Sequence, residues 1–142
     1  MLDEPVLVDS GALIALYSTT DPFHEACLEQ AKVLPLAKAY TCWPVITEAS
    51  YLLRRYFAQR EQLLNAVHGG DFSLLQLHSE EVAGLRDIIA KYHDQEVDLA
   101  DAALVYLADR EGIESIFTTD RRHFSVYRKR NGQPFRLLPE IK

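Results

Sequence analysis

The sequence predicts an α/β fold, a three-layer α/β/α sandwich around a short, mostly parallel sheet. Two observations predict this class: short apolar runs typical of buried strands recur along the chain, and stretches with helical periodicity separate them. Strands that alternate with helices favour a parallel sheet covered on both faces. A third observation is the length of 142 residues without linker, repeat or low-complexity tract, which predicts a single domain over 1–142.

Each expected element has a local signal. The strands are short runs rich in apolar or β-branched residues, at 6–8, 40–43, 72–77, 115–118 and 135–138. The helices show apolar residues at three- and four-residue spacing, at 10–18, 21–34, 44–56, 61–68, 79–92 and 98–111, with a turn or short helix at 120–124.

Capping residues predict where several helices begin and end. Asp21 and Pro22 fit the cap and the first helical position, and Pro35 ends that helix. Ser79 is expected to cap the helix that follows it, and Gly112 to end the helix over 98–111. The apolar face of the helix that Pro44 opens is expected to comprise Val45, Ala49, Leu52, Leu53 and Tyr56.

Composition predicts a cytoplasmic protein without membrane association. No basic segment followed by an apolar segment marks a secretory signal, and no apolar stretch approaches the roughly 20 residues that span a bilayer. Cys27 and Cys42 belong to no CxxC or Cys/His pattern, so we expect two reduced cysteines.

Positive charge is concentrated in one segment of an acidic chain. The net charge is −6, from 15 basic and 21 acidic side chains, yet the segment 121–130 is +5 and the rest is −11. This segment is interpreted either as a solvated loop or as a surface that binds RNA phosphates. Its basic residues are Arg121, Arg122, Arg128, Lys129 and Arg130.

Four acidic residues occur where an α/β chain would bring them together: Asp9, Glu48, Asp101 and Asp120. Asp9 and Asp120 each end an apolar run, and ligands bind beyond the carboxyl ends of parallel strands. Glu48 lies one turn into a helix, and Asp101 lies in an apolar helical stretch. Carboxylates at such places are costly unless a cation compensates them. The pattern predicts a metal-dependent enzyme that cleaves phosphodiester bonds.

Simpler roles compete for three of these acids. Asp9 suits a helix cap, Asp120 suits a turn, and Glu48 would fit an ion pair with an arginine. Asp101 is harder to explain otherwise, because no Lys or Arg lies three or four residues from it. Asp98, one turn earlier, is interpreted as a supporting residue, a residue of the helix start or an extra ligand, with Asp101 as the primary member.

The predicted cofactor is Mg²⁺ or Mn²⁺. Both ions prefer oxygen ligands, and four carboxylates can share one or two ions that activate water and neutralise a leaving oxygen. The sequence contains no HExxH, Cys/His zinc set, P-loop or GxSxG motif.

Four segments carry a resemblance to a known family: Val8-Asp9-Ser10-Gly11-Ala12, Thr47-Glu48, Leu99-Ala100-Asp101-Ala102 and Thr118-Thr119-Asp120-Arg121-Arg122-His123-Phe124. They resemble the PIN-domain ribonucleases, in particular the VapC-type toxins of prokaryotic toxin–antitoxin pairs. The similarity runs essentially end to end. It implies a PIN-like sandwich and Mg²⁺- or Mn²⁺-dependent endonucleolytic cleavage of RNA.

The resemblance also implies roles and partners. Asp9 and Asp101 would bind the principal metal, Glu48 would complete its shell or position the attacking water, and Asp120 would bind a second ion or reach the first through water. Thr118 and Ser10 would support this cluster. The implied partners are a homodimeric second copy and a small antitoxin that places a basic or bulky side chain in the acidic pocket.

Alternative functions differ in what they require. A PIN-type RNA-processing nuclease would share the acidic site but have no antitoxin, and a catalytically inactive PIN domain would bind RNA or another partner without cutting. A phosphoacceptor receiver domain is disfavoured, because Ser10 and Gly11 follow Asp9 and no Asp follows the run 72–77.

Overall fold

Five parallel strands form the centre of the computed structural model, which describes residues 4–34 and 38–140. Leu7, in the middle strand, lies opposite Tyr40 on one side and Ile116 on the other. The strands follow the spatial order β3-β2-β1-β4-β5, with bounds β1 (Val6–Val8), β2 (Ala39–Thr41), β3 (Ser73–Leu74), β4 (Ser115–Phe117) and β5 (Arg136–Leu138).

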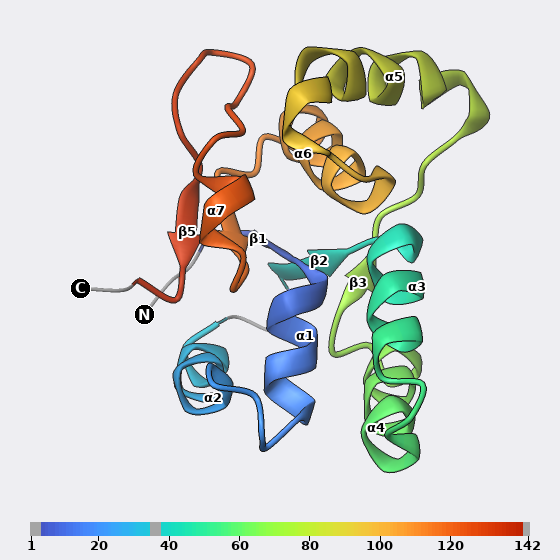
Figure 1. Cartoon of the computed structure of the whole chain (residues 1–142), viewed down its shortest axis with the longest axis vertical. Helices are drawn as coiled ribbons and strands as arrows, with labels where there is room; N and C mark the ends of the chain where they lie inside the picture. Colours follow the sequence, from blue (N-terminus) through green and yellow to red (C-terminus); the bar gives the residue numbers. More distant parts are fainter. Residues whose placement is uncertain (1–3, 35–37, 141–142) are drawn as a thin grey trace.

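Helices connect successive strands, as parallel strands require. The helices are α1 (Ser10–Tyr17), α2 (His24–Lys32), α3 (Trp43–Leu52), α4 (Phe57–His68), α5 (Val82–Lys91), α6 (Leu99–Glu111) and α7 (Arg121–Phe124), with 3₁₀ turns η2 (Ser79–Glu81) and η3 (His93–Gln95). In Figure 1, α5 and α6 lie in the upper part of the view, α1 to α4 in the lower part, and the strands pass between them.

The predicted three-layer α/β/α class is confirmed, with a sheet that is parallel throughout. Helix α5 packs on α6, while α1 contacts α2, α3 and α4. None of the described helices is long and apolar enough to cross a bilayer.

The core is centred on the two middle strands. Every residue of β1 and β4 is buried, and α6 buries most of its circumference, as its apolar sequence predicts. Fully burying a large aliphatic side chain contributes about 1.5–3 kcal/mol to folding. The middle strands therefore form a stable base for the residues that follow them.

Two expected boundaries are wrong for local reasons, and a third falls outside the described residues. Asp21 does not cap a helix at Pro22; its Oδ1 accepts a hydrogen bond from Phe23 N–H, which closes a turn before α2 begins at His24. Ser79 does not cap α5, because it opens the 3₁₀ turn η2. Helix α2 ends at Lys32, and Pro35, expected to end it, lies outside the described residues.

Two expectations of extent are also wrong. Strand β3 has only two residues, since it lies at the sheet edge and pairs with β2 alone. Leu52 and Tyr56 are not part of the buried face of α3: the helix ends at Leu52, and the two side chains are 50% and 56% exposed. Val45, Ala49 and Leu53 are buried as predicted.

Candidate active site

Two neighbouring strands bring Asp9 and Thr118 side by side at the carboxyl edge of the sheet. Val8 pairs with Phe117, and the N–H of Asp9 donates to the Phe117 carbonyl at 2.9 Å. The Thr118 hydroxyl then donates to Asp9 Oδ2 at 2.8 Å. Gly11 permits this close approach, because a Cβ there would collide with the Thr119 side chain. The first two members of the site are thus positioned by strand register.

Asp9 is a buried carboxylate with an unsatisfied oxygen. The residue is 3% exposed, and Oδ1 has no hydrogen-bond partner among the described residues. It occupies the N-cap position of α1, but its side chain makes no capping hydrogen bond. Burial raises the pKa of Asp9 to about 6, against the Thr118 hydrogen bond, and the charges of Asp120 and Asp98 raise it further. The role of a simple helix cap therefore does not describe this side chain.

Glu48 reaches the same site from α3. Its Oε1 accepts a hydrogen bond from the Ser10 hydroxyl at the start of α1. Partial burial raises the pKa of Glu48 to about 7; the Ser10 hydrogen bond lowers it, and the neighbouring carboxyls of Asp98 and Asp9 raise it. Among the described residues, no Lys or Arg side chain forms an ion pair with Glu48.

The first turn of α6 supplies two more acids. Asp98 is the N-cap of the helix, and its Oδ1 accepts a hydrogen bond from the N–H of Asp101 at 2.8 Å. Asp101 itself is 8% exposed. Burial raises the pKa of Asp101 to about 8, and the charges of Asp9, Asp98 and Asp120 contribute. Asp98 thus has the expected role at the helix start and also adds negative charge to the site.

Asp120 is the N-cap of the short helix α7 and accepts hydrogen bonds from it. Its Oδ1 accepts from the N–H of His123 at 3.0 Å, and its Oδ2 lies 2.9 Å from His123 Nδ1. The N–H of Asp120 donates to the Thr118 hydroxyl at 2.9 Å, so the same threonine contacts two members of the acidic group. The predicted turn role of Asp120 is therefore present, alongside its nearness to Asp9 and Asp101.

Tyr127 is a contact that the sequence did not single out. Its hydroxyl donates to Asp101 Oδ2 at 2.8 Å, and the residue is fully buried. No sequence motif marks a tyrosine in a basic segment as part of an acidic site. The available signal was the three-residue spacing of Phe124 and Tyr127, which predicts that one side of this segment faces the core.

The basic residues of 121–130 are dispersed rather than gathered beside the acids. Arg121 Nη1 donates to the Leu137 carbonyl, and its Nε and Nη2 are buried without a partner among the described residues. Lys129 pairs with Glu114 at 2.9 Å. Arg128 donates to main-chain carbonyls of its own loop, whereas Arg122 and Arg130 are exposed.

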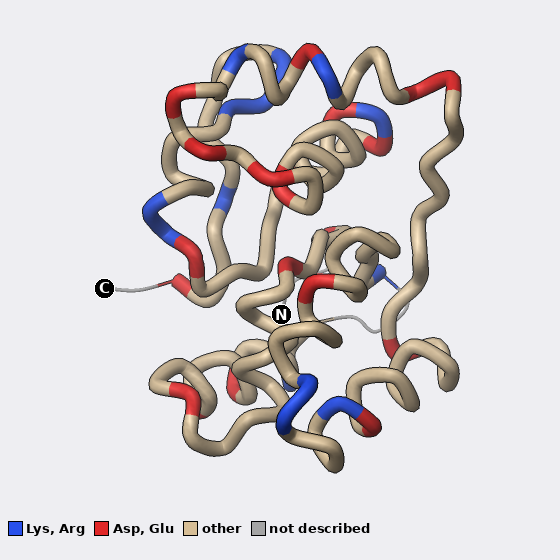
Figure 2. The backbone as a smooth tube through the Cα atoms, turned by 45° about the vertical axis from the view of Figure 1, so that its right-hand side comes forward, with Lys and Arg blue, Asp and Glu red and all other residues tan. Residues whose placement is uncertain are grey.

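A cavity of about 610 Å³ adjoins the acidic group. Glu48 and Asp98 line it on one side, and Trp43, Tyr51 and Leu99 are among its apolar walls. In Figure 2, some acidic positions (red) lie in the middle of the molecule, while other acidic positions and most basic positions (blue) lie nearer its outer parts. The site thus combines negative charge with exposed aromatic surface.

The acidic group fits a divalent cation by donor chemistry and charge. Asp9, Glu48, Asp98 and Asp101 offer carboxylate oxygens, which Mg²⁺ and Mn²⁺ prefer, and Asp9 Oδ1 lacks any other partner. Within 4–34 and 38–140, no three acidic, histidine or cysteine side chains close around one ion as they stand. Burial is the main cause of the raised pKa values of Asp9, Glu48 and Asp101, and repulsion between the acids adds to it; a bound cation would offset both.

Comparisons with known proteins identify the family of this chain. The family model described as PIN domain matches residues 6–129. Over 139 residues the chain is 32% identical to Ribonuclease VapC26 of Mycobacterium tuberculosis (strain ATCC 25618 / H37Rv), covering 94% of this chain and 100% of that protein.

Two solved structures share the fold. The crystal structure of Mycobacterium tuberculosis VapC20, described as a sarcin–ricin loop cleaving toxin, has a TM-score of 0.75 at 15% identity, covering 82% of this chain and 91% of that one. PAE2754 from Pyrobaculum aerophilum has a TM-score of 0.53 at 21% identity, covering 83% and 81%. With an acidic group at the carboxyl edge of the middle strands, this chain belongs to the PIN domain family, among its VapC-type ribonucleases.

Proposed function

We propose that the protein is a Mg²⁺- or Mn²⁺-dependent endoribonuclease and the toxin of a toxin–antitoxin pair. The observation that carries the proposal is the buried carboxylate of Asp9, whose Oδ1 has no hydrogen bond among the described residues and whose neighbours are further acids. A buried carboxylate among other acids is favourable when it is protonated or when it binds a cation, and a cation bound there would leave the carboxylates charged as ligands. The identity to Ribonuclease VapC26 over nearly the whole chain supports RNA as the substrate.

The roles of the acids follow from their surroundings. Asp9 and Asp101 are the buried members and would hold the principal ion. Glu48, which Ser10 orients and which lines the open cavity, would complete the shell or position the attacking water. When bound, the cation supplies positive charge beside the scissile phosphate and lowers the pKa of a bound water.

Asp120 and Asp98 would act from the edge of the site. Asp120 would bind a second ion or reach the first through water, although His123 contacts both of its carboxylate oxygens. Asp98 would fix the first turn of α6 and thereby the position of Asp101. Thr118 would hold Asp9 and Asp120 at a fixed separation.

The proposal extends to three partners. RNA would enter through the cavity beside Glu48 and Asp98, and the exposed basic residues Arg122 and Arg130 would contact its phosphates. A second copy of the chain would cover exposed apolar side chains around Leu52 and Phe57. A small antitoxin would neutralise the acidic pocket.

The first prediction is that Asp9→Asn and Asp101→Asn each abolish RNA cleavage without unfolding the protein. Each change removes one negative charge from the site while keeping the side-chain shape. In the metal-free protein each variant should melt at or above the wild-type temperature, because a buried charge is removed. The measurement is cleavage of total cellular RNA by purified protein with Mg²⁺, with Mn²⁺ and with EDTA.

Asp94→Asn is the matched control, because Asp94 is an exposed carboxylate that is not among the charges that raise the pKa of Asp9, Glu48 or Asp101. It should cut RNA like the wild type, and EDTA should stop both. Wild-type cleavage by purified Asp101→Asn would show that the acidic site is not the catalytic centre. Absence of cleavage by the wild type with any divalent metal would favour an inactive RNA-binding domain.

A second experiment separates the toxin from an RNA-processing nuclease. A toxin should arrest growth when it is expressed alone, and a small protein encoded beside it should restore growth and block cleavage by the purified enzyme. An active enzyme with no such neighbour would be assigned to RNA processing.

A further inference from the structure

Tyr127 follows α7 in the sequence and is held in the core between α7 and the end of α5. The residue is fully buried, and its ring meets those of Tyr92 and Phe124 edge to face, with centroid distances of 5.0 Å and 5.2 Å. The His123 ring lies nearly parallel to it at 6.5 Å. Aromatic contacts of this kind stabilise a unique ring orientation. The hydroxyl of Tyr127 therefore has a defined direction.

That hydroxyl contacts one oxygen of Asp101. The bond runs from Tyr127 to Oδ2 at 2.8 Å and joins two elements that are 26 residues apart in the sequence. Asp101 Oδ1 accepts no hydrogen bond in the part of the chain that the structure describes. The N–H of Asp101 is fixed in turn by Asp98. Asp101 is thus fixed by one hydrogen bond to its main-chain N–H and by another to its carboxylate.

We infer that Tyr127 is a positioning residue, which orients the Asp101 carboxylate so that Oδ1 is available to a divalent cation. The inference rests on the proposed metal site and adds a residue to it. Hydrogen-bond donors behind a ligating carboxylate fix its rotamer, and their loss typically lowers metal affinity 10- to 100-fold. The donor in this case is a neutral hydroxyl, which satisfies Oδ2 without competing with the ion by charge.

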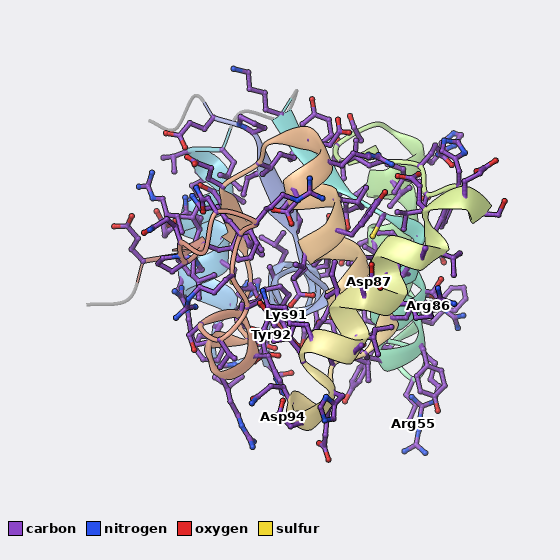
Figure 3. The ribbon with its side chains drawn as sticks, turned by 90° about the horizontal axis from the view of Figure 1, so that it is seen from above. Arg55, Arg86, Asp87, Lys91, Tyr92 and Asp94 are labelled. Carbon is purple, nitrogen blue, oxygen red and sulfur yellow. The ribbon has the colours of Figure 1, made fainter. Side chains whose placement is uncertain are left out.

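Tyr92 provides a control that separates positioning from packing. Figure 3 shows Tyr92 at the end of α5, and its hydroxyl accepts a hydrogen bond from the N–H of Arg128 at 2.9 Å. Tyr92→Phe and Tyr127→Phe each remove one buried hydroxyl and keep the edge-to-face ring contact. Only Tyr127→Phe removes a contact with Asp101.

The second prediction concerns Mn²⁺ affinity. Titration of the metal-free protein with Mn²⁺, followed by calorimetry or by the electron paramagnetic resonance signal of free Mn²⁺, should give a Kd that rises about tenfold or more in Tyr127→Phe. Tyr92→Phe should keep the wild-type Kd within about twofold. Denaturant unfolding without metal should show that both variants are folded and that each has lost part of its stability.

The same titration in an Asp101→Asn background completes a double-mutant cycle. If Tyr127 acts through Asp101, Tyr127→Phe should cause little further loss of Mn²⁺ affinity there. An equal loss in both backgrounds, or a Kd for Tyr127→Phe equal to the wild type, would overturn the positioning role and leave the proposed nuclease intact. Absence of Mn²⁺ and Mg²⁺ binding by the wild type would overturn both.

Discussion

The hydroxyl of Thr118 ties the acidic site together at the scale of single residues. It donates to Asp9 Oδ2 and accepts from the N–H of Asp120, so one side chain sets the spacing of two carboxylates. Asp101 was predictable from the sequence, because an apolar helix face without a nearby cation leaves few explanations for an acid. Tyr127 was not, because its role depends on a contact across 26 residues that local patterns do not encode.

The basic residues of 121–130 also show what the sequence alone does not predict. Their clustering in the sequence allowed either a solvated loop or one positive surface, and their side chains diverge once the segment turns. Arg122 is exposed, and its guanidinium forms no hydrogen bond or ion pair with the described residues, whereas Lys129 is paired with Glu114. Sequence alone gives the net charge of a segment; the directions of its side chains come from the fold.

The third prediction follows from this divergence. Arg122→Ala should weaken binding of RNA by the cleavage-deficient Asp101→Asn protein and reduce the slope of log affinity against log salt by about one. Lys129→Ala should change affinity much less, since the lysine already has an acidic partner. Filter binding between about 50 and 200 mM salt measures both. Equal effects of the two variants would argue against a specific role for Arg122.

Among the secondary-structure elements, the junction of α3 and α4 differs most from the sequence-based expectation. Periodicity placed Leu52 and Tyr56 on a buried stripe, but α3 ends at Leu52 and the chain turns before α4. Tyr51, Leu52, Tyr56 and Phe57 are consequently exposed by 60%, 50%, 56% and 76%. Large apolar side chains exposed together on one corner are typical of an interaction surface.

The fourth prediction is that this corner forms the dimer interface. Leu52→Asp or Phe57→Asp should leave the monomer folded, because both side chains are already exposed, and should shift a dimer to monomer. Val82→Asp is the control, since Val82 is 54% exposed on α5 at the other end of the molecule. Light scattering after size-exclusion chromatography measures the mass. Dimers that persist in both corner variants would place the interface elsewhere.

At the scale of the whole molecule, the protein places mutually repelling, partly buried carboxylates next to its central strands. The sheet class and the carboxyl-edge location of the site were predictable from alternating strands and helices. Neither the spatial order β3-β2-β1-β4-β5 nor the close pairing of Asp9 with Thr118 was predictable, because both depend on contacts over more than a hundred residues.

The fifth prediction is that the metal-free protein loses stability as the pH rises. The pKa values of Asp9, Glu48 and Asp101 are raised in the folded state to about 6, 7 and 8. The folded state therefore binds protons more tightly than the unfolded state, and this stabilisation is lost as the pH rises through that range. Between pH 5 and pH 8.5 in EDTA, the melting temperature should fall by about 5 °C or more.

Two further conditions test the cause of this fall. Millimolar Mg²⁺ or Mn²⁺ should reduce it, because a bound cation takes the place of the protons. Asp101→Asn should also flatten the profile, since one of the raised groups is gone. A wild-type melting temperature that is unchanged or rises towards pH 8.5 in EDTA would contradict the raised pKa values of these three acids.

The strand order has a consequence for when a newly made chain acquires its complete acidic site. The middle strand β1 carries Asp9, but its neighbour β4 and the residues Thr118, Asp120 and Tyr127 all come from the last fifth of the sequence. A nascent or truncated chain that stops before this region contains Asp9 and Glu48 but lacks β4, the strand that pairs with β1 beside Asp9. Under the proposed function, cleavage would thus require that synthesis has passed Tyr127, long after Asp9 has been made.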